Sequence, residues 1–232
     1  KILTTGAHHA DWCFVLVRTD PVAPKHKGIS FLLVDMKSPG IQVRPIVNMA
    51  GFHEFNEVFF EDVRVPVSNR VGEENNGWYV AMTLLDFERS NVASIAANQR
   101  TLELLADYSR EKKPGGAYAD ILRHKIADMW IANETGRLLS YRTAWMQESG
   151  RVANYEASVI KVFATELAAR ITNFGVNLLG LSGELEPDSK FAPFDGIIEK
   201  GHLANVSPLI YSGSSEIQRN IIATRGLGLP RD

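Results

Sequence analysis

The chain has 232 residues, of which 45% are hydrophobic and 22% are charged, an ordinary composition for one large or two modest globular domains. Its formal net charge of −2 leaves no basic surplus to neutralise phosphates, which argues against a nucleic-acid-binding protein. No apolar run reaches membrane-spanning length, so we expect neither a transmembrane helix nor membrane binding.

The amino-terminal end of the chain indicates one part of a longer protein. The sequence begins at Lys1 without a methionine, enters a predicted strand almost at once, and shows no signal-peptide pattern. Cys13 is the only cysteine, so an internal disulfide is excluded, and its apolar surroundings predict a buried, reduced thiol. We therefore expect a cytoplasmic protein.

Residues 1–72 predict a partial β-domain. The segment 12–18 is apolar on both faces, which is typical of a central strand. Short turns rich in Pro and Gly separate the apolar segments, which favours an antiparallel sheet or a fragment of a barrel. The expected strands are residues 12–18, 29–34, 41–47 and 57–65.

His8, His9 and Asp11 lie close together and raise the question of a metal site. Adjacent histidines on an extended segment point to opposite faces, and no further cluster of ligand residues follows in the sequence. We therefore expect a polar turn here and no bound metal.

Residues 73–232 predict a helical domain. Long segments with helical periodicity are joined by short loops containing glycine, which favours an antiparallel four-helix bundle. Residues 187–193, which are bounded by prolines, are expected to be irregular. The fold class of the whole chain is therefore predicted to be α+β. The expected helices are residues 76–110, 118–148, 154–179 and 214–225.

Glu88 lies near the middle of the first expected helix. Its neighbours three and four positions away include Leu84, Leu85 and Val92, so a carboxylate is placed on a mostly apolar face. Burial raises the pKa of a carboxyl group, and a general base for carbon-acid chemistry needs this property. The alternatives are an interhelical salt bridge, or a helix rotated so that Glu88 faces solvent.

A second candidate site precedes the last expected helix, in the segment Tyr211-Ser212-Gly213-Ser214-Ser215-Glu216. The first backbone N–H groups of a helix are unpaired and can hold an anion or a carbonyl oxygen. Serine and glycine are also common as ordinary helix caps, so the segment fits both interpretations.

Four stretches that occur in order resemble the acyl-CoA dehydrogenase family: residues 1–6, 55–66, 86–89 and 215–223, the last reading SEIQRNIIA. The resemblance covers essentially the whole chain. It implies the back half of the family's middle β-domain followed by its C-terminal helical domain. The ending GLGLPR at 226–231 looks like bacterial members.

The resemblance implies a chemistry. In this family a glutamate removes the α-proton of an acyl-CoA thioester, hydride leaves the β-carbon for N5 of FAD, and a 2-enoyl-CoA forms. Many members place the base directly after the tyrosine of the last-helix motif, where this chain has Ser212, which cannot serve as a base. A minority place it on the first helix of the C-terminal domain, before an arginine; here these positions are Glu88 and Arg89.

The resemblance therefore implies Glu88 as the catalytic base. It places Arg89, Tyr211, Ser212 and Gly213 at the substrate, with the Ser212 N–H polarising the thioester carbonyl. The alternative for Arg89 is a structural ion pair with Asp86, three residues earlier.

An FAD site is implied in the same way. Thr5 matches the threonine that contacts flavin N5, while Leu3 stands where the family usually has a tryptophan. Leu181 replaces a usual glycine, and Lys112 replaces an arginine that reaches FAD across a dimer. The remaining implied positions are Ser214 and Glu216, near the diphosphate and adenosine, and Asn177, Gly180 and Gly183, in the loop that receives the adenosine end of the neighbouring subunit's FAD.

The predicted function is FAD-dependent dehydrogenation of an acyl-CoA, with electrons passed to an electron-transfer flavoprotein. The resemblance implies a homotetramer, as a dimer of dimers, or a heteromer. An acyl-CoA oxidase would differ by fast reoxidation of the flavin by oxygen. A different alternative is a non-catalytic partner subunit of a heteromeric dehydrogenase, which the departures at Leu3, Leu181 and Lys112 favour and Glu88 opposes.

Overall fold

The structure is a computed structural model that describes residues 1–87 and 91–230. The chain divides into two compact units, Lys1–Leu85 and Asp86–Asp232, and each is considered by itself. Within the described ranges, no helix is both long and apolar enough to cross a bilayer.

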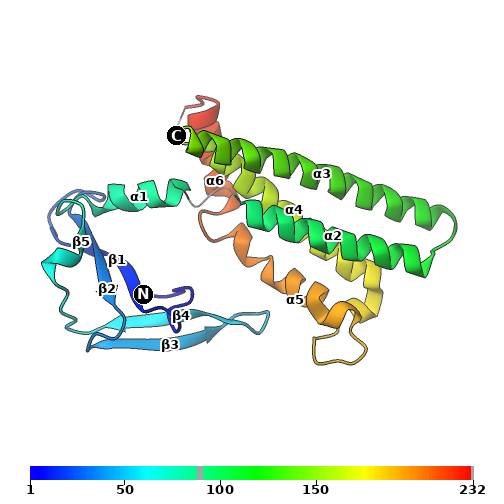
Figure 1. Ribbon diagram of the computed structural model, residues 1–232, viewed down its shortest axis with the longest axis horizontal. Coiled ribbons are helices and arrows are strands. Elements are labelled where there is room, and N and C mark those ends of the chain that lie inside the picture. The colour runs from blue at the N-terminus through cyan, green and yellow to red at the C-terminus, as the bar shows by residue number, and fades with distance from the viewer. Residues whose placement is uncertain (88–90, 231–232) are drawn as a thin grey trace. The chain divides into compact units, whose positions relative to one another are not determined.

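The first unit contains two small antiparallel sheets (Figure 1). In one sheet, β2 (Ile29–Asp35) lies between β1 (Trp12–Arg18) and β5 (Arg70–Val71). In the other, β3 (Ile41–Val47) pairs with β4 (His53–Phe60) in a register interrupted near Val47. The fourth strand therefore begins and ends earlier than the predicted 57–65, because its pairing with β3 starts at His53.

The prediction that residues 12–18 form a central strand is wrong. β1 pairs only with β2 in the described chain and lies at the edge of its sheet. Only one of its faces is covered: Val15 is buried, whereas Trp12 and Phe14 are more than half exposed. The prediction of a buried Cys13 is also wrong, since this residue is only partly buried, although burial still raises the pKa of its thiol.

The predicted continuous helix 76–110 is two helices, α1 (Gly77–Phe87) and α2 (Val92–Lys112). Asn91, immediately before α2, has a φ of 54°, and a left-handed residue cannot continue a right-handed helix. Gly77 allows α1 to begin against β2, because a Cβ there would lie 2.2 Å from the backbone nitrogen of Phe31. A short 3₁₀ turn, η1 (Val67–Asn69), precedes β5.

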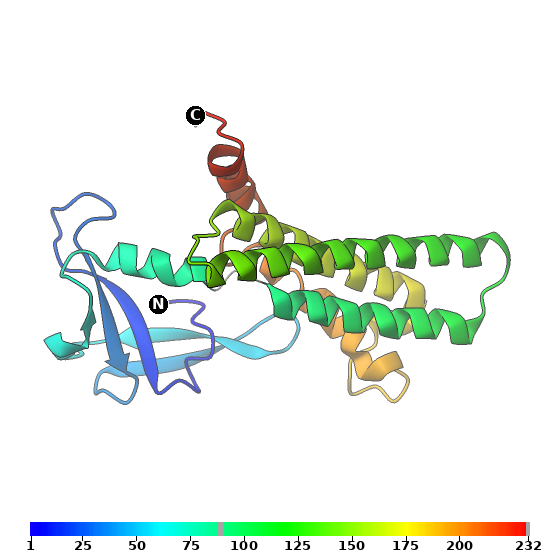
Figure 2. The same cartoon turned by 45° about the horizontal axis from the view of Figure 1, so that its top comes forward.

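Each of the three long helices of the second unit runs antiparallel to the one before it in the sequence (Figure 2). α2 is followed after a short turn by α3 (Gly116–Glu148), and α4 (Tyr155–Leu179) returns alongside both. Shorter helices complete the bundle against α4: α5 (Ile197–Ala204) and α6 (Ser215–Ile221). The predicted antiparallel bundle is therefore confirmed, and α3 and α4 lie within two residues of their predicted ends.

Helix α5 was not predicted. It follows the predicted irregular segment and two 3₁₀ turns, η2 (Gly180–Glu184) and η3 (Pro193–Gly196). Only one of its residues, Ile198, is fully buried, so tertiary packing rather than a long apolar pattern stabilises it. The last helix ends as predicted near Arg225, because a π-helical turn, η5 (Ile222–Gly226), extends α6; a 3₁₀ turn, η4 (Ser207–Leu209), precedes it.

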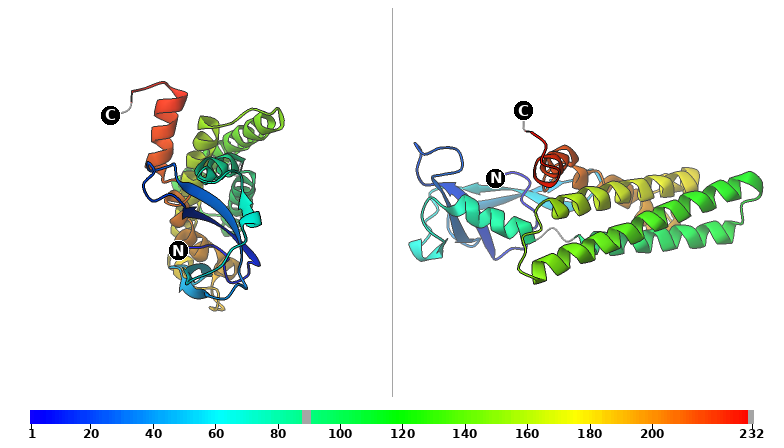
Figure 3. Two further views of the ribbon diagram at one scale, coloured as in Figure 1. Left: turned by 90° about the vertical axis from the view of Figure 1, so that its left-hand side faces the viewer. Right: turned by 90° about the horizontal axis from the view of Figure 1, so that it is seen from above.

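Helix α4 is the centre of the second unit. It contacts α2, α3, α5 and α6, and the right-hand view of Figure 3 shows it running alongside α3. Many of its buried residues are small, which lets several helices approach it closely. Those small buried residues are Ala157, Ser158, Ala164, Thr165, Ala168, Thr172 and Gly175.

We predict that Leu105→Ala destabilises the second unit by about 2–5 kcal/mol, because it leaves a cavity in a packed core. Leu105 is 0% exposed, and its side chain packs against Gly175 of α4. The matched control is its neighbour Leu104, which is 37% exposed and whose truncation should cost less than about 1 kcal/mol. Urea unfolding followed by circular dichroism measures both; equal losses would contradict this packing.

Candidate functional site

The turn before α6 has an unusual backbone. Ser212 and Gly213 both have positive φ, 53° and 85°. A serine in this conformation costs about 1–2 kcal/mol, so it persists only where the surrounding structure enforces it. Ser214 then caps α6 in the usual way, since its side chain accepts a hydrogen bond from the backbone N–H of Ile217 at 3.4 Å.

Two buried side chains hold this turn. Lys161 of α4 is 4% exposed, and its ammonium group donates to the carbonyl oxygens of Pro208 at 2.8 Å and Gly213 at 2.7 Å. The buried Gln218 of α6 donates from Nε2 to the carbonyl oxygen of Ser212 at 2.8 Å. Side-chain donors therefore fix the carbonyl oxygens of both Ser212 and Gly213, the two residues with positive φ, and so enforce the strained backbone.

An ion pair ties α6 to the central helix nearby. Arg219 forms an ion pair with Glu166 of α4, with Nη1 2.7 Å from Oε1 and Nη2 donating to Oε2 at 2.8 Å. The hydrogen bond from Arg219 lowers the pKa of Glu166. A hydrogen bond from Ser214 lowers the pKa of Glu216, so both carboxyl groups are ionised at neutral pH.

The turn leaves polar groups available, the backbone N–H of Ser212 among them. The backbone N–H of Ser212 has no acceptor within the described ranges, although the Ser212 carbonyl is bound by Gln218. An N–H held in a fixed direction can donate to a carbonyl or oxyanion of a ligand. Of the predicted substrate-contacting residues, the structure brings Tyr211, Ser212 and Gly213 together in this turn, and Ser214 and Glu216 follow directly.

The predicted cofactor loop lies at the carboxyl end of α4. Gly180 has a φ of 59° and a ψ of −140°, and open space surrounds the position of a Cβ there. Gly183 is required by packing instead, because a Cβ would lie 2.7 Å from the carbonyl oxygen of Val176. The Asn177 amide donates to the Asn173 carbonyl of its own helix at 2.7 Å.

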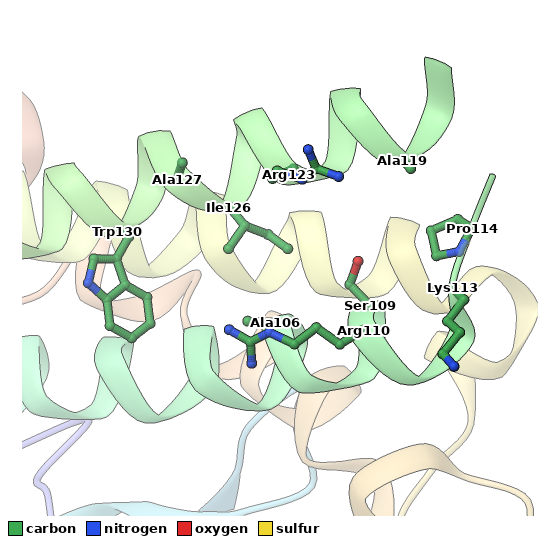
Figure 4. Close-up of a pocket in the computed structure, with 10 residues that line it drawn as sticks. All are labelled: Ala106, Ser109, Arg110, Lys113, Pro114, Ala119, Arg123, Ile126, Ala127 and Trp130. Carbon is green, nitrogen blue, oxygen red and sulfur yellow. The ribbon is translucent and has the colours of Figure 1, made fainter. Parts of the chain in front are cut away.

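Lys112, at the end of α2, lies over the ring of Tyr108, with Nζ 5.3 Å from the ring centroid. It does not line the nearby pocket of about 600 Å³ between α2 and α3, which Figure 4 shows. In that pocket Arg110 pairs with Asp107, and Arg123 lies 3.5 Å from Asp120. No predicted site residue lines this pocket, whose other lining residues are Ala106, Ser109, Lys113, Pro114, Ala119, Ile126, Ala127 and Trp130.

The predicted flavin-contacting residues of the first unit precede β1. Thr4 and Asn56 exchange backbone hydrogen bonds at 2.9 and 3.0 Å, so the first residues extend the edge of β4. Thr5 is exposed and makes no hydrogen bond with its side chain within the described chain. Leu3 is 60% exposed with a φ of 59°, a conformation that an L residue adopts rarely.

Sequence reasoning missed a polar cluster beside Thr5. The rings of His8 and His53 stack at 3.9 Å, and the fully buried Asn56 joins them. Its Nδ2 donates to Nδ1 of His8 at 3.0 Å, and its Oδ1 accepts from Nε2 of His53 at 2.8 Å. His8 and His53 also line a pocket of about 420 Å³ that includes Thr5. Across the described ranges, no group of three or more His, Cys, Asp or Glu residues could hold a metal ion.

Glu88 and Arg89, the predicted base and its neighbouring substrate residue, lie outside the described residues. The apolar face on which Glu88 was placed is divided between two helices, with Leu84 and Leu85 on α1 and Val92 on α2. The apolar residues around position 88 therefore do not form one continuous helix face, and they no longer indicate that Glu88 is buried. The assignment of Glu88 stays a prediction from the resemblance alone.

Family models match both parts of the chain. The acyl-CoA dehydrogenase middle-domain model matches residues 1–63, and the acyl-CoA dehydrogenase C-terminal-domain model matches residues 75–227. The chain therefore belongs to the acyl-CoA dehydrogenase family.

Individual relatives agree with this assignment. The acyl-CoA dehydrogenase IpdE1 of Mycobacterium tuberculosis is 36% identical over all of this chain and 59% of its own length. Among solved structures, the Tcur3481-Tcur3483 steroid ACAD is 32% identical with a TM-score of 0.92, matching 100% of this chain and 60% of that one. The ChsE4-ChsE5 complex of Mycobacterium tuberculosis is 33% identical with a TM-score of 0.86, matching 99% and 60%. The chain thus spans about 60% of the length of these relatives.

We predict that Lys161→Met destabilises the second unit by about 2–4 kcal/mol, because it removes two charge-assisted hydrogen bonds and leaves the Pro208 and Gly213 carbonyls without their donor. The same substitution at the exposed Lys125 of α3 should change stability by less than about 0.5 kcal/mol. Urea unfolding measures both. An unchanged midpoint for Lys161→Met would show that the turn does not need this ammonium group.

We also predict that the His8 cluster loses stability in acid. Burial, followed by the nearby His53 and His9, lowers the pKa of His8 below its ordinary value of 6.5. The unfolded chain therefore binds a proton at His8 more readily than the folded chain does. The stability that the neutral His8 contributes to the folded state is complete above pH 6.5 and is lost as the pH falls below it. His8→Gln should flatten the dependence of the urea midpoint between pH 8 and 5. His124→Gln, at an exposed site on α3, should leave the dependence unchanged.

Proposed function

We propose that the whole protein is an FAD-dependent acyl-CoA dehydrogenase that converts an acyl-CoA thioester to a 2-enoyl-CoA and passes the electrons to an electron-transfer flavoprotein. Family membership and the similarity to named acyl-CoA dehydrogenases support the reaction class. The substrate, the acceptor and the activity of the whole protein belong to this proposal, since the chain spans about 60% of its relatives.

The observation that carries the proposal is the Ser212 turn. In an α-proton abstraction, negative charge develops on the thioester carbonyl oxygen, and a fixed N–H donor stabilises it. The Ser212 N–H is proposed as such a donor, because Gln218 binds the carbonyl oxygen of Ser212 and Lys161 binds that of the following Gly213, which holds the backbone of the turn. A rigid donor is effective because it needs no rearrangement as the charge forms.

The base in this scheme is Glu88. Its carboxylate takes the α-proton, and loss of the β-hydride in the same overall reaction forms the Cα–Cβ double bond. The hydroxyl of Ser212 is unsuited to this task, since an alcohol needs a neighbouring base to be activated at neutral pH. Arg89 is proposed to bind the CoA portion of the substrate. FAD, when bound, supplies the hydride acceptor.

The residues present fit an FAD site. Thr5 offers an exposed hydroxyl that has no hydrogen-bond partner among the described residues, and Leu3 offers an exposed apolar surface beside it. In the second unit, the open space at Gly180 allows close approach to the backbone, and Lys112 supplies a cation for a diphosphate. Asn177, Gly183, Ser214 and Glu216 complete the proposed set.

We expect Glu88→Gln in the intact protein to lower the rate of acyl-CoA dehydrogenation by at least about 10³-fold, because the neutral amide cannot accept the α-proton. Flavin content and substrate binding should be unchanged, since the two side chains are almost the same size. Stopped-flow bleaching of the flavin absorbance by an acyl-CoA measures the step. Wild-type bleaching rates in this variant would rule out Glu88 as the base.

A second candidate is a non-catalytic partner subunit of a heteromeric dehydrogenase. Leu3, Leu181 and Lys112 depart from the family pattern around the cofactor, and the similar ChsE4-ChsE5 structure is a complex of two proteins. A purified protein that is yellow and is bleached by an acyl-CoA supports the enzyme. A colourless protein that gains activity only with a second, different chain supports the partner subunit.

The proposed location is the cytoplasm, and the proposed assembly is a dimer of dimers or a heteromer. A reduced, unpaired Cys13 is consistent with a reducing compartment.

A further inference from the structure

The first residues of the chain pair with β4 in an irregular register (Figure 1). Lys1 exchanges backbone hydrogen bonds with Val58 at 2.7 and 2.8 Å, and Thr4 exchanges them with Asn56 at 2.9 and 3.0 Å. The first segment therefore advances by three residues where β4 advances by two, which defines a β-bulge. Leu3, with its φ of 59°, lies inside this bulge. The bulge decides which of the following side chains face outward, because a shift of one residue moves each side chain to the other face.

Thr5 is placed by the residues on either side of it. Thr4 is partly buried and bonded to Asn56, and the backbone N–H of Gly6 donates to the carbonyl oxygen of Glu54 at 2.9 Å. Between these two attachments the Thr5 side chain is exposed, and its hydroxyl has no hydrogen-bond partner among the described residues. The direction of this hydroxyl therefore depends on how firmly Thr4 and Gly6 are held against β4.

Asn56 holds Thr4 with its side chain as well as with its backbone. The residue is 0% exposed, and its Nδ2 donates to the carbonyl oxygen of Thr4 at 3.1 Å and to Nδ1 of His8 at 3.0 Å. Its Oδ1 accepts from Nε2 of His53 at 2.8 Å. Both amide hydrogens and the amide oxygen are therefore used, as the burial of an amide requires.

The amide of Asn56 can make these hydrogen bonds in only one orientation. A carbonyl oxygen accepts hydrogen bonds and cannot donate them, so Nδ2 rather than Oδ1 must face Thr4. His8 then accepts at an unprotonated Nδ1, and His53 donates from a protonated Nε2. The two rings stack with their centroids 3.9 Å apart and hold the amide from its other side. The Asn56 side chain is thus fixed at both ends.

We propose that Asn56 is a positioning residue for the flavin site, because its amide holds the backbone next to Thr5 and so fixes the direction of the Thr5 hydroxyl. This inference rests on the proposed function, in which Thr5 contacts flavin N5. That nitrogen accepts a hydrogen bond in oxidised FAD and carries a hydrogen in reduced FAD, so a hydroxyl held beside it interacts differently with the two forms. Asn56 therefore sets the relative affinity for oxidised and reduced FAD.

Asn56→Asp tests this role with almost no change in side-chain volume. A carboxylate has no hydrogen to donate to the Thr4 carbonyl oxygen, so the side-chain attachment of Thr4 is lost. The matched control is Asn69→Asp in the same unit. Nδ2 of Asn69 donates to the carbonyl oxygen of Leu33 at 3.3 Å, so the control removes the same kind of bond without involving residues 1–6.

Spectroelectrochemical titration of the intact, FAD-loaded protein measures the midpoint potential. In Asn56→Asp, the ratio of the dissociation constants for oxidised and reduced FAD should change about tenfold, which is about 30 mV for a two-electron couple. Asn69→Asp should keep the wild-type potential. A merely structural role of Asn56 would weaken the binding of both forms equally and leave the potential unchanged, so a wild-type potential in Asn56→Asp would overturn the proposal.

Two further measurements test whether Asn56 acts through Thr5. Thr5→Val removes the hydroxyl and keeps the shape, so adding Asn56→Asp to it should not shift the potential further. Additive shifts would contradict a route through Thr5. Before FAD is added, Asn56→Asp should speed amide hydrogen exchange at Gly6 at least tenfold, and unchanged exchange would show that the amide does not hold this segment.

Failure of the proposed function gives a different result. A wild-type protein that binds FAD but is not bleached by an acyl-CoA would contradict the dehydrogenase reaction and leave the positioning role of Asn56 in place. A wild-type protein that binds no FAD would overturn both.

Discussion

The buried ammonium group of Lys161 is the interaction on which the candidate site depends. Removing a charge from water is costly unless strong partners replace the lost hydration, and here two backbone carbonyls do so. Because Lys161 belongs to the central helix, the segment from Pro208 to Gly213 is fixed relative to the core of the second unit. The left-handed backbone at Ser212 and Gly213 is thus stabilised by a side chain from the central helix of the bundle.

The elements that were predicted correctly have strong local patterns. α3 and α4 are long, periodic and bounded by glycine or turn residues, so pattern alone locates their ends. The break between α1 and α2 has no such signal, because Asn91 is neither glycine nor proline and takes its left-handed conformation from context. α5 was missed because one buried residue, Ile198, gives no periodicity to detect. β1 was misjudged because apolar residues on two faces do not reveal which face is covered.

The candidate site could also be predicted from the sequence only in part. Small residues before α6 were visible in the sequence, and they do form a turn with an available N–H. What fixes the turn was not visible, since Lys161 lies about fifty positions earlier and on another helix. A lysine within the apolar stripe of α4 was the available signal. The His8 and His53 pair was missed for a similar reason, because only the pairing of residues 1–6 with β4 brings the two rings together.

The small side chains of α4 have a consequence for how this sequence can change over evolution. On the faces of α4 that contact its four neighbouring helices, an added methyl group has little space into which it could expand. Ala164, Ala168 and Gly175 therefore lie at positions where substitution is limited by volume rather than by chemistry. Amino-acid substitutions should therefore accumulate first on the outer helices. The buried positions of α4 should be substituted only when two facing residues change together.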